Sequence, residues 1–292
     1  MTSKLSDLGK RYGIYWLLLR KNKLAMSAIG VTLVFAFVAF FPSLIAPNDP
    51  YDIGLAAPLE PPSWRFPFGT DNLGRCLLSR VCHGARPSLY AGVICVGIGL
   101  VFGTIFGLIS GYYGGKLDSI IMGVTDVLLA LPFLLLAIVI VTFLGPSLDA
   151  AIMGVGVWMI PQYIRLARAQ SLQIKQSDYI TAAKMTGESD MNIIFRYVLP
   201  NSLSVIIVQS VVYLARAILF TSGLSFLGLG AQPPSPEWGA IASDARNHML
   251  FSPHFIFFPS FAIFITAISF NIMGDTLRDI LDPQQRMRLL FR

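Results

Sequence analysis

The chain has 292 residues, of which 54% are hydrophobic and 13% are charged, and its formal net charge at pH 7 is +6. Soluble domains are about 25% charged, so these charges are too few to coat a water-soluble globule of this size, and the composition excludes that class. Membrane topology explains the excess of basic residues without a nucleic-acid partner. Three cysteines in a chain this long do not form a disulfide scaffold.

The first apolar run extends from Leu24 to Ile45 and contains no charged residue. It is long enough to cross a hydrocarbon core, which takes about 20 residues. Basic residues predominate before it, and Asp7 is the single acid among them. A signal peptide would have a shorter apolar region and a small-residue cleavage site. The pattern therefore predicts an uncleaved first span that starts in the cytoplasm.

Five more apolar runs predict five more spans. Backbone polar groups in lipid must be satisfied within the segment, and the runs are too long for barrel strands, so the spans are expected to be helices. The predicted fold class is all-α integral membrane, with six transmembrane helices and both termini in the cytoplasm. The five later spans are expected at residues 89–110, 120–143, 148–166, 202–220 and 255–273.

The charges of the loops agree with this topology. Residues 145–148 carry no basic side chain and are expected outside, whereas residues 167–201 carry several and are expected inside. Residues 47–87 hold four arginines but are expected outside, because long translocated segments obey the positive-inside rule less strictly. The predicted division is an N-terminal tail, first span and outer segment at 1–87, a membrane domain at 88–280 that includes the cytoplasmic loop 167–201, and a C-terminal cytoplasmic tail at 281–292.

Four glycines follow one another at intervals of four residues in and just after the second predicted span. They are Gly99, Gly103, Gly107 and Gly111. This spacing places them on one face of a helix, where the lack of side chains lets another helix approach closely. Two interpretations remain open: close packing within this chain, or an interface with another subunit.

No motif for nucleotide binding or catalysis is found in the sequence. A Walker A loop needs G-x-x-x-x-G-K-[ST], whereas the glycine pair before Lys116 lacks the upstream glycine, and Leu117 follows the lysine. Neither an HExxH zinc site nor a GxSxG nucleophile turn is present. We expect a non-catalytic chain without a nucleotide site of its own.

A metal site is not expected from the cysteines and the histidine that precede the second predicted span. Cys76 and Cys82 are six residues apart in the sequence, which is about 240° around a helix that turns about 100° per residue. The two thiols therefore do not share a helix face, and a metal site that includes them and His83 is not expected.

Residues 178–202, DYITAAKMTGESDMNIIFRYVLPNS, form a polar stretch between two apolar spans. The stretch predicts a short cytoplasmic helix with a small, apolar side, formed by Ile180, Ala182, Ala183 and Met185. Two interpretations of such a helix are an interfacial helix lying on the membrane and a docking element for a soluble partner.

Three residues set the expected limits of this short helix. Asp178 is expected to cap its N-terminus or to place a favourable charge there. Gly187 interrupts it, and Pro200 is expected to permit a new helix that leads into the fifth span.

The polar stretch resembles the EAA loop of bacterial ABC importer permeases. Thr181 stands where many members of that family have the glutamate. The residues that carry the resemblance are Asp178, Tyr179, Ile180, Ala182, Ala183, Gly187, Leu199, Pro200 and Asn201.

Other blocks narrow the resemblance. Residues 68–89, FGTDNLGRCLLSRVCHGARPSL, resemble the GTDxxGRDxxSRxxxGARxSL signature of the C-type permease of dipeptide, oligopeptide and nickel importers. Cys76 stands where an aspartate is usual, and Gly123 where an arginine is usual. Later blocks of the same family are similar to residues 111–138, 224–239 and 271–283. The chain is thus identified as a member of this family over nearly its whole length.

The resemblance implies the transmembrane domain of a type I ABC importer in the bacterial cytoplasmic membrane. It implies a heterodimer with a B-type permease subunit, two cytoplasmic ATPases that bind ATP and Mg, and an extracytoplasmic binding protein that delivers the solute. It implies no cofactor in this chain. Peptides are the expected solute, with nickel or another metal chelate as the alternative. The residues expected to couple to the ATPases are Asp178, Tyr179, Ala182, Ala183, Gly187, Leu199 and Pro200.

Ionisable residues inside a span are candidates for function. Asp126 in the third span belongs to the family pattern, which favours a structural role over the solute pathway. Arg216 lies in the fifth span, roughly 21 Å from Ser202 at about 1.5 Å per residue. It either snorkels to the outer surface or lines the solute pathway, where it would attract a carboxylate.

Two other classes of membrane protein are weighed against the importer subunit. A secondary transporter needs no ATPase and often shows inverted repeats, but no repeat relates the halves of this chain, and the EAA-like loop would have no purpose. A membrane-embedded enzyme needs a cluster of catalytic polar residues at depth, which two isolated ionisable groups do not provide.

Overall fold

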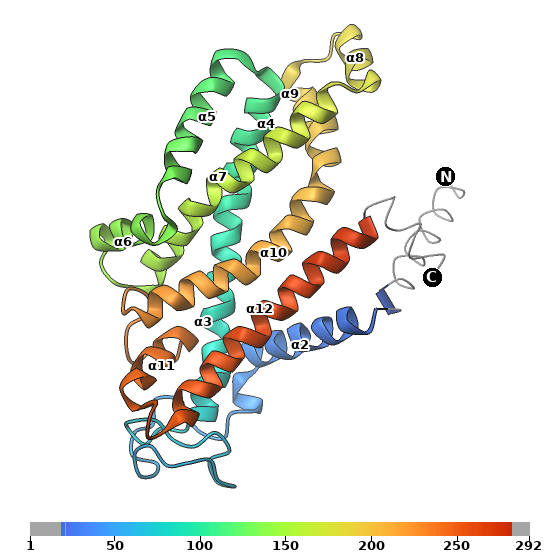
Figure 1. The fold of residues 1–292 in the computed structure, drawn as a ribbon. Helices are drawn as coiled ribbons and strands as arrows, with labels where there is room; N and C mark the ends of the chain where they lie inside the picture. The colour runs from blue at the N-terminus through green and yellow to red at the C-terminus, as the bar shows by residue number, and fades with distance from the viewer. Residues whose placement is uncertain (1–18, 21, 282–292) are drawn as a thin grey trace.

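The computed structural model describes residues 19–20 and 22–281, whose helices are assembled into an elongated bundle (Figure 1). In these residues the regular structure is helical, apart from an isolated antiparallel bridge between Thr70 and Cys76. The tails expected before residue 19 and after residue 281 lie outside the described residues. The helices are α2 (Lys23–Phe40), η1 (Pro42–Leu44), α3 (Leu77–Ile98), η2 (Gly99–Gly103), α4 (Thr104–Tyr113), α5 (Gly115–Ala130), α6 (Phe133–Leu144), α7 (Leu148–Lys175), α8 (Asp178–Met185), α9 (Asp190–Ile193), η3 (Ile194–Val198), α10 (Leu199–Phe226), α11 (Trp238–Ala245), η4 (Arg246–His248) and α12 (Pro253–Leu281).

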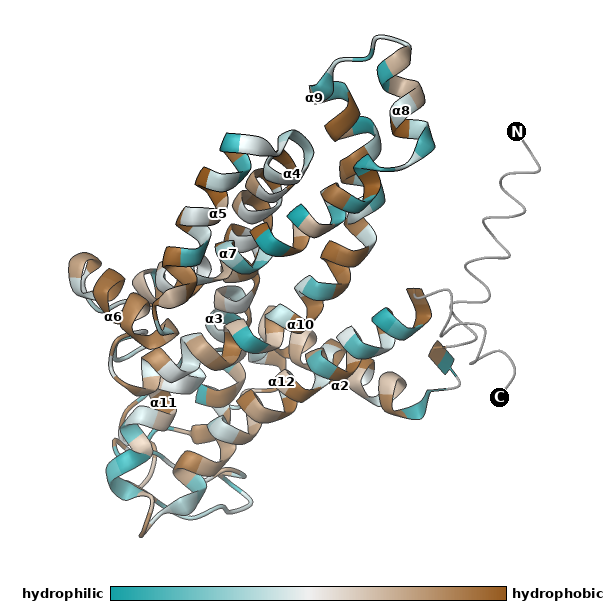
Figure 2. Ribbon diagram, turned by 45° about the horizontal axis from the view of Figure 1, so that its top comes forward, coloured by the Kyte–Doolittle hydropathy of each residue, from teal (hydrophilic) through white to brown (hydrophobic). Residues whose placement is uncertain are grey.

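All six apolar runs are helical. Within the described residues, five helices are long and apolar enough to cross a membrane: Lys23–Phe40, Leu77–Tyr113, Leu148–Lys175, Asp190–Phe226 and Pro253–Leu281. The middles of these helices are largely apolar, while hydrophilic segments gather around α8 and α9 and in the loops below α11 (Figure 2). The expected helical spans are therefore confirmed for five of the six runs.

The third predicted span, 120–143, is not one straight helix. α5 and α6 meet at an angle of 93°, with the break at Leu131 and Pro132 (Figure 1). Leu131 is extended, with φ −80° and ψ 127°, because the ring of the following proline disfavours helical geometry in the residue before it. The six predicted spans therefore correspond, in the described residues, to five continuous helices and one bent pair of helices.

The second predicted span begins earlier than its apolar run. The helix starts at Leu77 and passes through Pro87, so the segment that was expected outside ends at Cys76, and the expected division at 87/88 falls inside α3. The first turns of α3 contain polar residues such as Ser79 and Arg80, which are fully buried against other parts of this chain. Hydropathy cannot recognise a helix whose polar side chains are buried in protein.

The fifth span also begins earlier than expected. A continuous helix extends from Asp190 to Phe226 and does not restart at Pro200. The backbone widens to a π-type turn over Ile194–Val198, where the N–H of Leu199 donates to the carbonyl of Ile194. Such a turn accommodates the proline, which has no N–H to donate within the helix.

The glycine face of the second span packs against α7. A Cβ atom added to Gly99 would lie 2.8 Å from Cβ of Met159, and one added to Gly107 would lie 2.5 Å from the carbonyl oxygen of Ile164. Real Cβ atoms essentially never approach other atoms so closely. The interpretation of close packing within this chain is confirmed, and α4 and α7 form the centre of the bundle.

Alanine at Gly107 should therefore destabilise the folded protein. The added methyl forces α4 and α7 apart, at a cost of about 1–3 kcal/mol in the free energy of unfolding. Gly97 is the matched control, because its own Cβ would meet nothing within 4 Å in the described structure. Gly97→Ala should leave the free energy of unfolding unchanged or raise it, since alanine favours a helix over glycine. Denaturant unfolding of both variants in detergent tests this, and equal effects would contradict the packing argument.

The two ends of the bundle differ in construction. At one end lie α8, α9 and the turn at Gly114 between α4 and α5, and we call this the α8 end (Figure 1). At the other lie α11 and the irregular segment from Ile45 to Cys76, and we call this the α11 end.

Candidate functional site

The helix predicted within the polar stretch is α8, which follows α7 after a short turn. Ser177 is its N-cap residue, and no side chain caps the helix. Asp178 lies in the first turn, where its negative charge favours the positive end of the helix dipole. Of the two roles expected for Asp178, the structure shows the charge and not the capping bond.

Gly187 ends α8 in a left-handed turn, a backbone conformation that glycine adopts without strain. The N–H of Glu188 donates to the carbonyl of Ala183 at 3.2 Å, and the N–H of Gly187 donates to the carbonyl of Lys184 at 3.0 Å. This pair of bonds is a Schellman motif, and it needs a left-handed residue after the helix. Gly187 has a φ of +82°, so the interruption expected there is a defined turn.

The two sides of α8 have different surroundings. Ile180 and Ala183 are buried and belong to the main apolar core of the chain, together with Ile193. Ala182 faces outward. Ala183 therefore packs against this chain itself, and Ala182 is the one of the two alanines that a partner can reach.

Apolar side chains are exposed around α8. Met185 is 85% exposed, and Tyr179, Met191 and Phe195 are each about half exposed. Exposed apolar groups at an otherwise polar end of a membrane protein suit contact with another protein. Met191 and Phe195 were missed from the sequence because they lie in what reads as the polar approach to the fifth span.

Leu199 and Pro200, which the resemblance also implicates, lie in the first turn of α10. Leu199 is half-buried against the main core, whereas Pro200 is exposed. They are separated from α8 along the chain by α9 and the π-type turn η3.

Tyr112, at the end of α4, connects α8 and α9 to the long helices. Its hydroxyl donates to Oδ1 of Asp190 at 2.7 Å, and its carbonyl accepts from Nζ of Lys175 at 2.5 Å. Nζ of Lys184 on α8 lies 5.0 Å from the centre of its ring. A displacement of α8 would thus reach α4 and α7 through one buried side chain, which no sequence pattern singles out.

Two ion pairs join α5 to α7. Arg168 donates to both carboxylate oxygens of Asp118, at 2.6 and 2.7 Å, and this pair is mostly buried. Nη2 of Arg165 lies 2.7 Å from Oδ1 of Asp126, and these two side chains are 55% and 59% exposed. Asp126 thus has an inter-helix partner, as the structural interpretation expects, but it also faces outward.

Arg216 on α10 is exposed, and its guanidinium carbon lies 5.6 Å from the ring centre of Tyr213. The hydroxyl of Tyr213 donates to Oε1 of Gln162 on α7 at 3.4 Å, and Gln162 lies about one turn before Arg165. Two groups of polar side chains therefore lie about one turn apart on α7: Asp126 with Arg165, and Gln162 with Tyr213 and Arg216. We call the two groups together the polar track, and its members are Asp126, Arg165, Gln162, Tyr213 and Arg216.

The signature at residues 68–89 builds a buried ion cluster at the α11 end. Asp71 is fully buried and accepts from Nε of Arg75 at 2.5 Å and from the N–H groups of Leu73 and Arg75. Arg80 is 1% exposed and lies between Asp71 and Asp244 of α11, at 3.5 and 3.9 Å. Burial raises the pKa of Asp244, while Arg80 and Arg75 lower it. The cluster ties the irregular segment from Ile45 to Cys76 to α3 and α11.

The cysteines of this region are free thiols in the apolar packing. Cys76 immediately precedes α3, and both it and Cys82 are buried beside the ion cluster, while His83 is half-buried and contacts the carbonyl of Ser79. Among the described residues, no group of three or more metal-binding side chains comes together.

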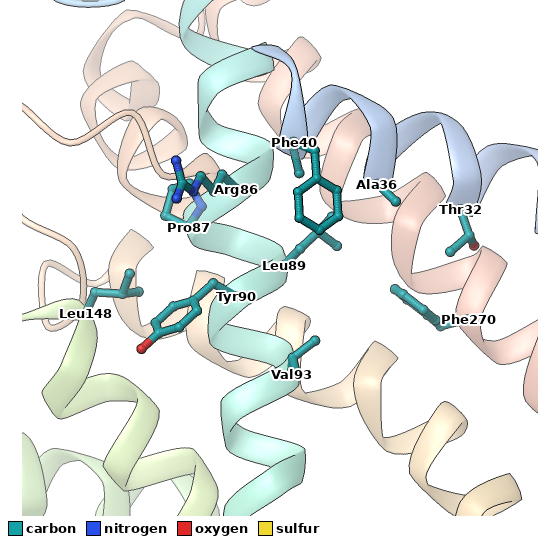
Figure 3. A pocket seen from close by; sticks show the side chains of 11 residues that line it. Thr32, Ala36, Phe40, Arg86, Pro87, Leu89, Tyr90, Val93, Leu148 and Phe270 are labelled. Carbon is teal, nitrogen blue, oxygen red and sulfur yellow. The ribbon is translucent and has the colours of Figure 1, made fainter.

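A cavity of about 770 Å³ opens between α2, α3, α12 and the start of α7 (Figure 3). Its lining is mostly apolar, with exposed rings from Phe40 and Tyr90 and one cation, Arg86. Figure 3 shows Phe40 descending from α2 between Arg86 and Leu89 of α3, with Phe270 of α12 on the far side.

Comparison with known proteins gives consistent results. Residues 103–287 match the family described as "Binding-protein-dependent transport system inner membrane component", and residues 12–62 match the "N-terminal TM domain of oligopeptide transport permease C". The dipeptide transport system permease protein DppC of Haemophilus influenzae is 41% identical over 276 residues, which cover 92% of this chain and 94% of that protein. The glutathione transport system permease protein GsiD of Escherichia coli O6:K15:H31 is 44% identical over 271 residues, which cover 92% of this chain and 89% of that protein.

Among solved structures, inward-facing MetNI, a methionine ABC transporter, has a similar chain. Its TM-score is 0.58 at 18% identity, and the match covers 70% of this chain and 97% of that chain. The likeness shows the fold, so the all-α transmembrane fold of a type I importer, expected from the sequence, is confirmed.

Proposed function

Because the chain belongs to the family of binding-protein-dependent transport system inner membrane components, we propose that it forms half of the path by which an ATP-driven importer brings short peptides into the bacterium. It is a multi-pass protein of the inner membrane. The observation that carries the proposal is its likeness, over 92% of the chain, to permeases of dipeptides and of glutathione, which are both short peptides.

The α8 end is the proposed contact with the ATPases. α8 and the turn at Gly187 present exposed apolar side chains, and Tyr112 ties this region to α4 and α7. An ATPase that pushes on α8 would therefore move the centre of the bundle. The buried side of α8, formed by Ile180 and Ala183, supports this role because it makes the helix move with the chain.

A second, related permease subunit is the proposed partner within the membrane. The cavity between α2 and α3 and its exposed rings, Phe40 and Tyr90, form an apolar surface that a helix of that subunit can fill. The solute path would lie between the two subunits. A binding protein would deliver the peptide at the α11 end, opposite the ATPases.

Purification of the tagged chain from its own membranes tests the assembly. We expect two ATPases and a second permease to copurify, and the complex, with its binding protein, to import a labelled dipeptide or glutathione into proteoliposomes only when ATP is supplied. Import driven by an ion gradient without ATP would instead establish a secondary transporter. A chain that catalyses a reaction alone would contradict the non-catalytic role.

The orientation of the chain provides a separate prediction. Ser63 at the α11 end should lie outside, and Thr181 on α8 should lie inside, because the segment around α8 carries several basic residues. Both are exposed, and the native cysteines are buried and can be replaced. In intact cells an impermeant thiol reagent should label Ser63→Cys and spare Thr181→Cys. The reverse pattern would overturn the orientation.

A further inference from the structure

The polar track lies on apolar helices, yet its charged members point away from the chain's own core. The side chains of Asp126 and Arg165 are more than half exposed, and Arg216 is exposed as well. Charged groups within spans avoid lipid and face water-filled cavities or other protein. The face that carries the polar track is therefore directed at the space beside this subunit, which in the proposed importer is the solute path.

The members of the track differ in how their charges are satisfied. Asp126 has one charged partner, Arg165, through a single pair of atoms at 2.7 Å. The guanidinium of Arg216 lies over the ring of Tyr213, and it pairs with no carboxylate of the described residues. At one end of the track, the carboxylate of Asp126 makes a single ion-pair contact. At the other end, the guanidinium of Arg216 makes none in the described residues.

Asp118 shows what a purely structural pair looks like in the same helices. Both of its oxygens accept from Arg168, Ser110 donates to it as well, and its side chain is 18% exposed. Asp118 has no open side for another cation, whereas Asp126 does.

We propose that the polar track binds the two charged ends of a zwitterionic peptide, with Asp126 receiving the α-ammonium group and Arg216 receiving the terminal carboxylate. This inference rests on the proposed function. A guanidinium binds a carboxylate through two parallel hydrogen bonds and stays charged at every physiological pH. At Asp126 the peptide's ammonium takes the place of Arg165, so one cation is exchanged for another and the carboxylate is never left unpaired.

The exchange also explains why Arg165 is beside Asp126. In the empty path, Arg165 neutralises the charge of Asp126, which has no other charged partner in the described residues. Arg165 contacts Asp126 through a single exposed ion pair, and such a pair is weak enough for another cation to displace Arg165. Arg165 therefore occupies Asp126 between peptides and competes with the peptide ammonium for it.

The test compares Asp126→Asn with Arg165→Gln in complexes reconstituted with all partner subunits, at equal amounts of assembled complex. The labelled peptide is a dipeptide or glutathione, whichever the wild type imports. Asp126→Asn should lower import about ten- to a hundredfold, because a charge-assisted hydrogen bond to the ammonium is lost. Arg165→Gln should lower import less than Asp126→Asn does, and it should lower the half-saturating concentration of the loaded binding protein, because the competitor is gone.

A structural pair gives a different result. If Asp126 and Arg165 only hold α5 to α7, both variants lose import equally, and the inference is overturned. Asp118→Asn is the control for a structural pair, and it should lower the amount of assembled complex. If the wild type imports the peptide and Asp126→Asn imports it equally well, the inference is overturned but the proposed function stands. If the wild type itself shows no ATP-dependent import of peptides, the proposed function is overturned.

The Arg216 end is tested with a matched pair of peptides, one with a free carboxylate and one amidated, delivered by a binding protein that accepts both. Arg216→Gln should lower import of the free acid about tenfold more than import of the amide. Arg216→Lys should restore only part of this preference, because lysine lacks the planar fork. Equal losses for both peptides, or no loss, would show that Arg216 is an anchor at the membrane surface.

Discussion

Asp71→Ala should be the most destabilising single substitution at the α11 end. Asp71 is fully buried between Arg75 and Arg80, and Arg80 is itself 1% exposed. Removal of this carboxylate leaves two buried guanidinium groups with only Asp244 nearby, and breaking a buried pair in this way costs about 3–5 kcal/mol. The N–H groups of Leu73 and Arg75 lose their acceptor as well.

Denaturant unfolding of the purified complex, with protease resistance of the outer segment as a second readout, measures this loss. Asp52→Ala is the matched control, because Asp52 is an exposed aspartate of the same segment that makes no ion pair with any residue the structure describes. The control should change the free energy of unfolding by less than about 0.5 kcal/mol. If Asp71→Ala and Asp52→Ala unfold at the same denaturant concentration, the ion cluster does not stabilise this end.

Gly187→Val should abolish most of the transport while the chain still inserts and assembles. Gly187 has a φ of +82°, and a left-handed backbone costs an L-residue roughly 1–2 kcal/mol, with β-branched residues affected most. An energy of 1.4 kcal/mol corresponds to about a tenfold change in an equilibrium, so the turn after α8 would leave its native geometry in most molecules. The exposed side of α8, which includes Met185 and Ala182, would then no longer have its present position for contact with an ATPase.

Gly187→Asn separates backbone strain from added bulk. Asparagine tolerates the left-handed region better than other residues with a side chain, and a Cβ at this position meets none of the described residues within 4 Å. Import and ATPase activity stimulated by the loaded binding protein should therefore be largely retained with asparagine and fall about tenfold with valine. Wild-type import and ATPase activity in Gly187→Val would count against a role of this turn in coupling.

The broken third span shows what local sequence can and cannot predict. The signal for the break was present, since Leu131 precedes Pro132 and a residue before proline avoids helical geometry. The 93° angle was not predictable, because a proline often only kinks a helix within a membrane. The direction of α6 depends on its packing against α7, where Ala137 and Val141 are fully buried.

The candidate site was predictable in part. The residues of α8 and Gly187 were identified by their order in the sequence, because a polar helix between apolar spans and a glycine at its end are local features. Tyr112 was not identified, because its partners Asp190, Lys175 and Lys184 are far from it in sequence. For the same reason the contact between Arg165 and Asp126 and the contact between Gln162 and Tyr213 emerged only in three dimensions.

The sequence by itself determined that this chain lies in a membrane, where its apolar runs are, and which family it belongs to, because hydropathy and motif order are properties of consecutive residues. Tertiary structure decided where α3 and the fifth span begin, because polar groups such as Arg80 are buried by distant parts of the chain. It also decided that the glycine face packs against α7, that Ala183 faces inward and that Asp126 faces outward. Burial and charge pairing depend on which helices meet, and helices meet through contacts between residues that are remote in sequence.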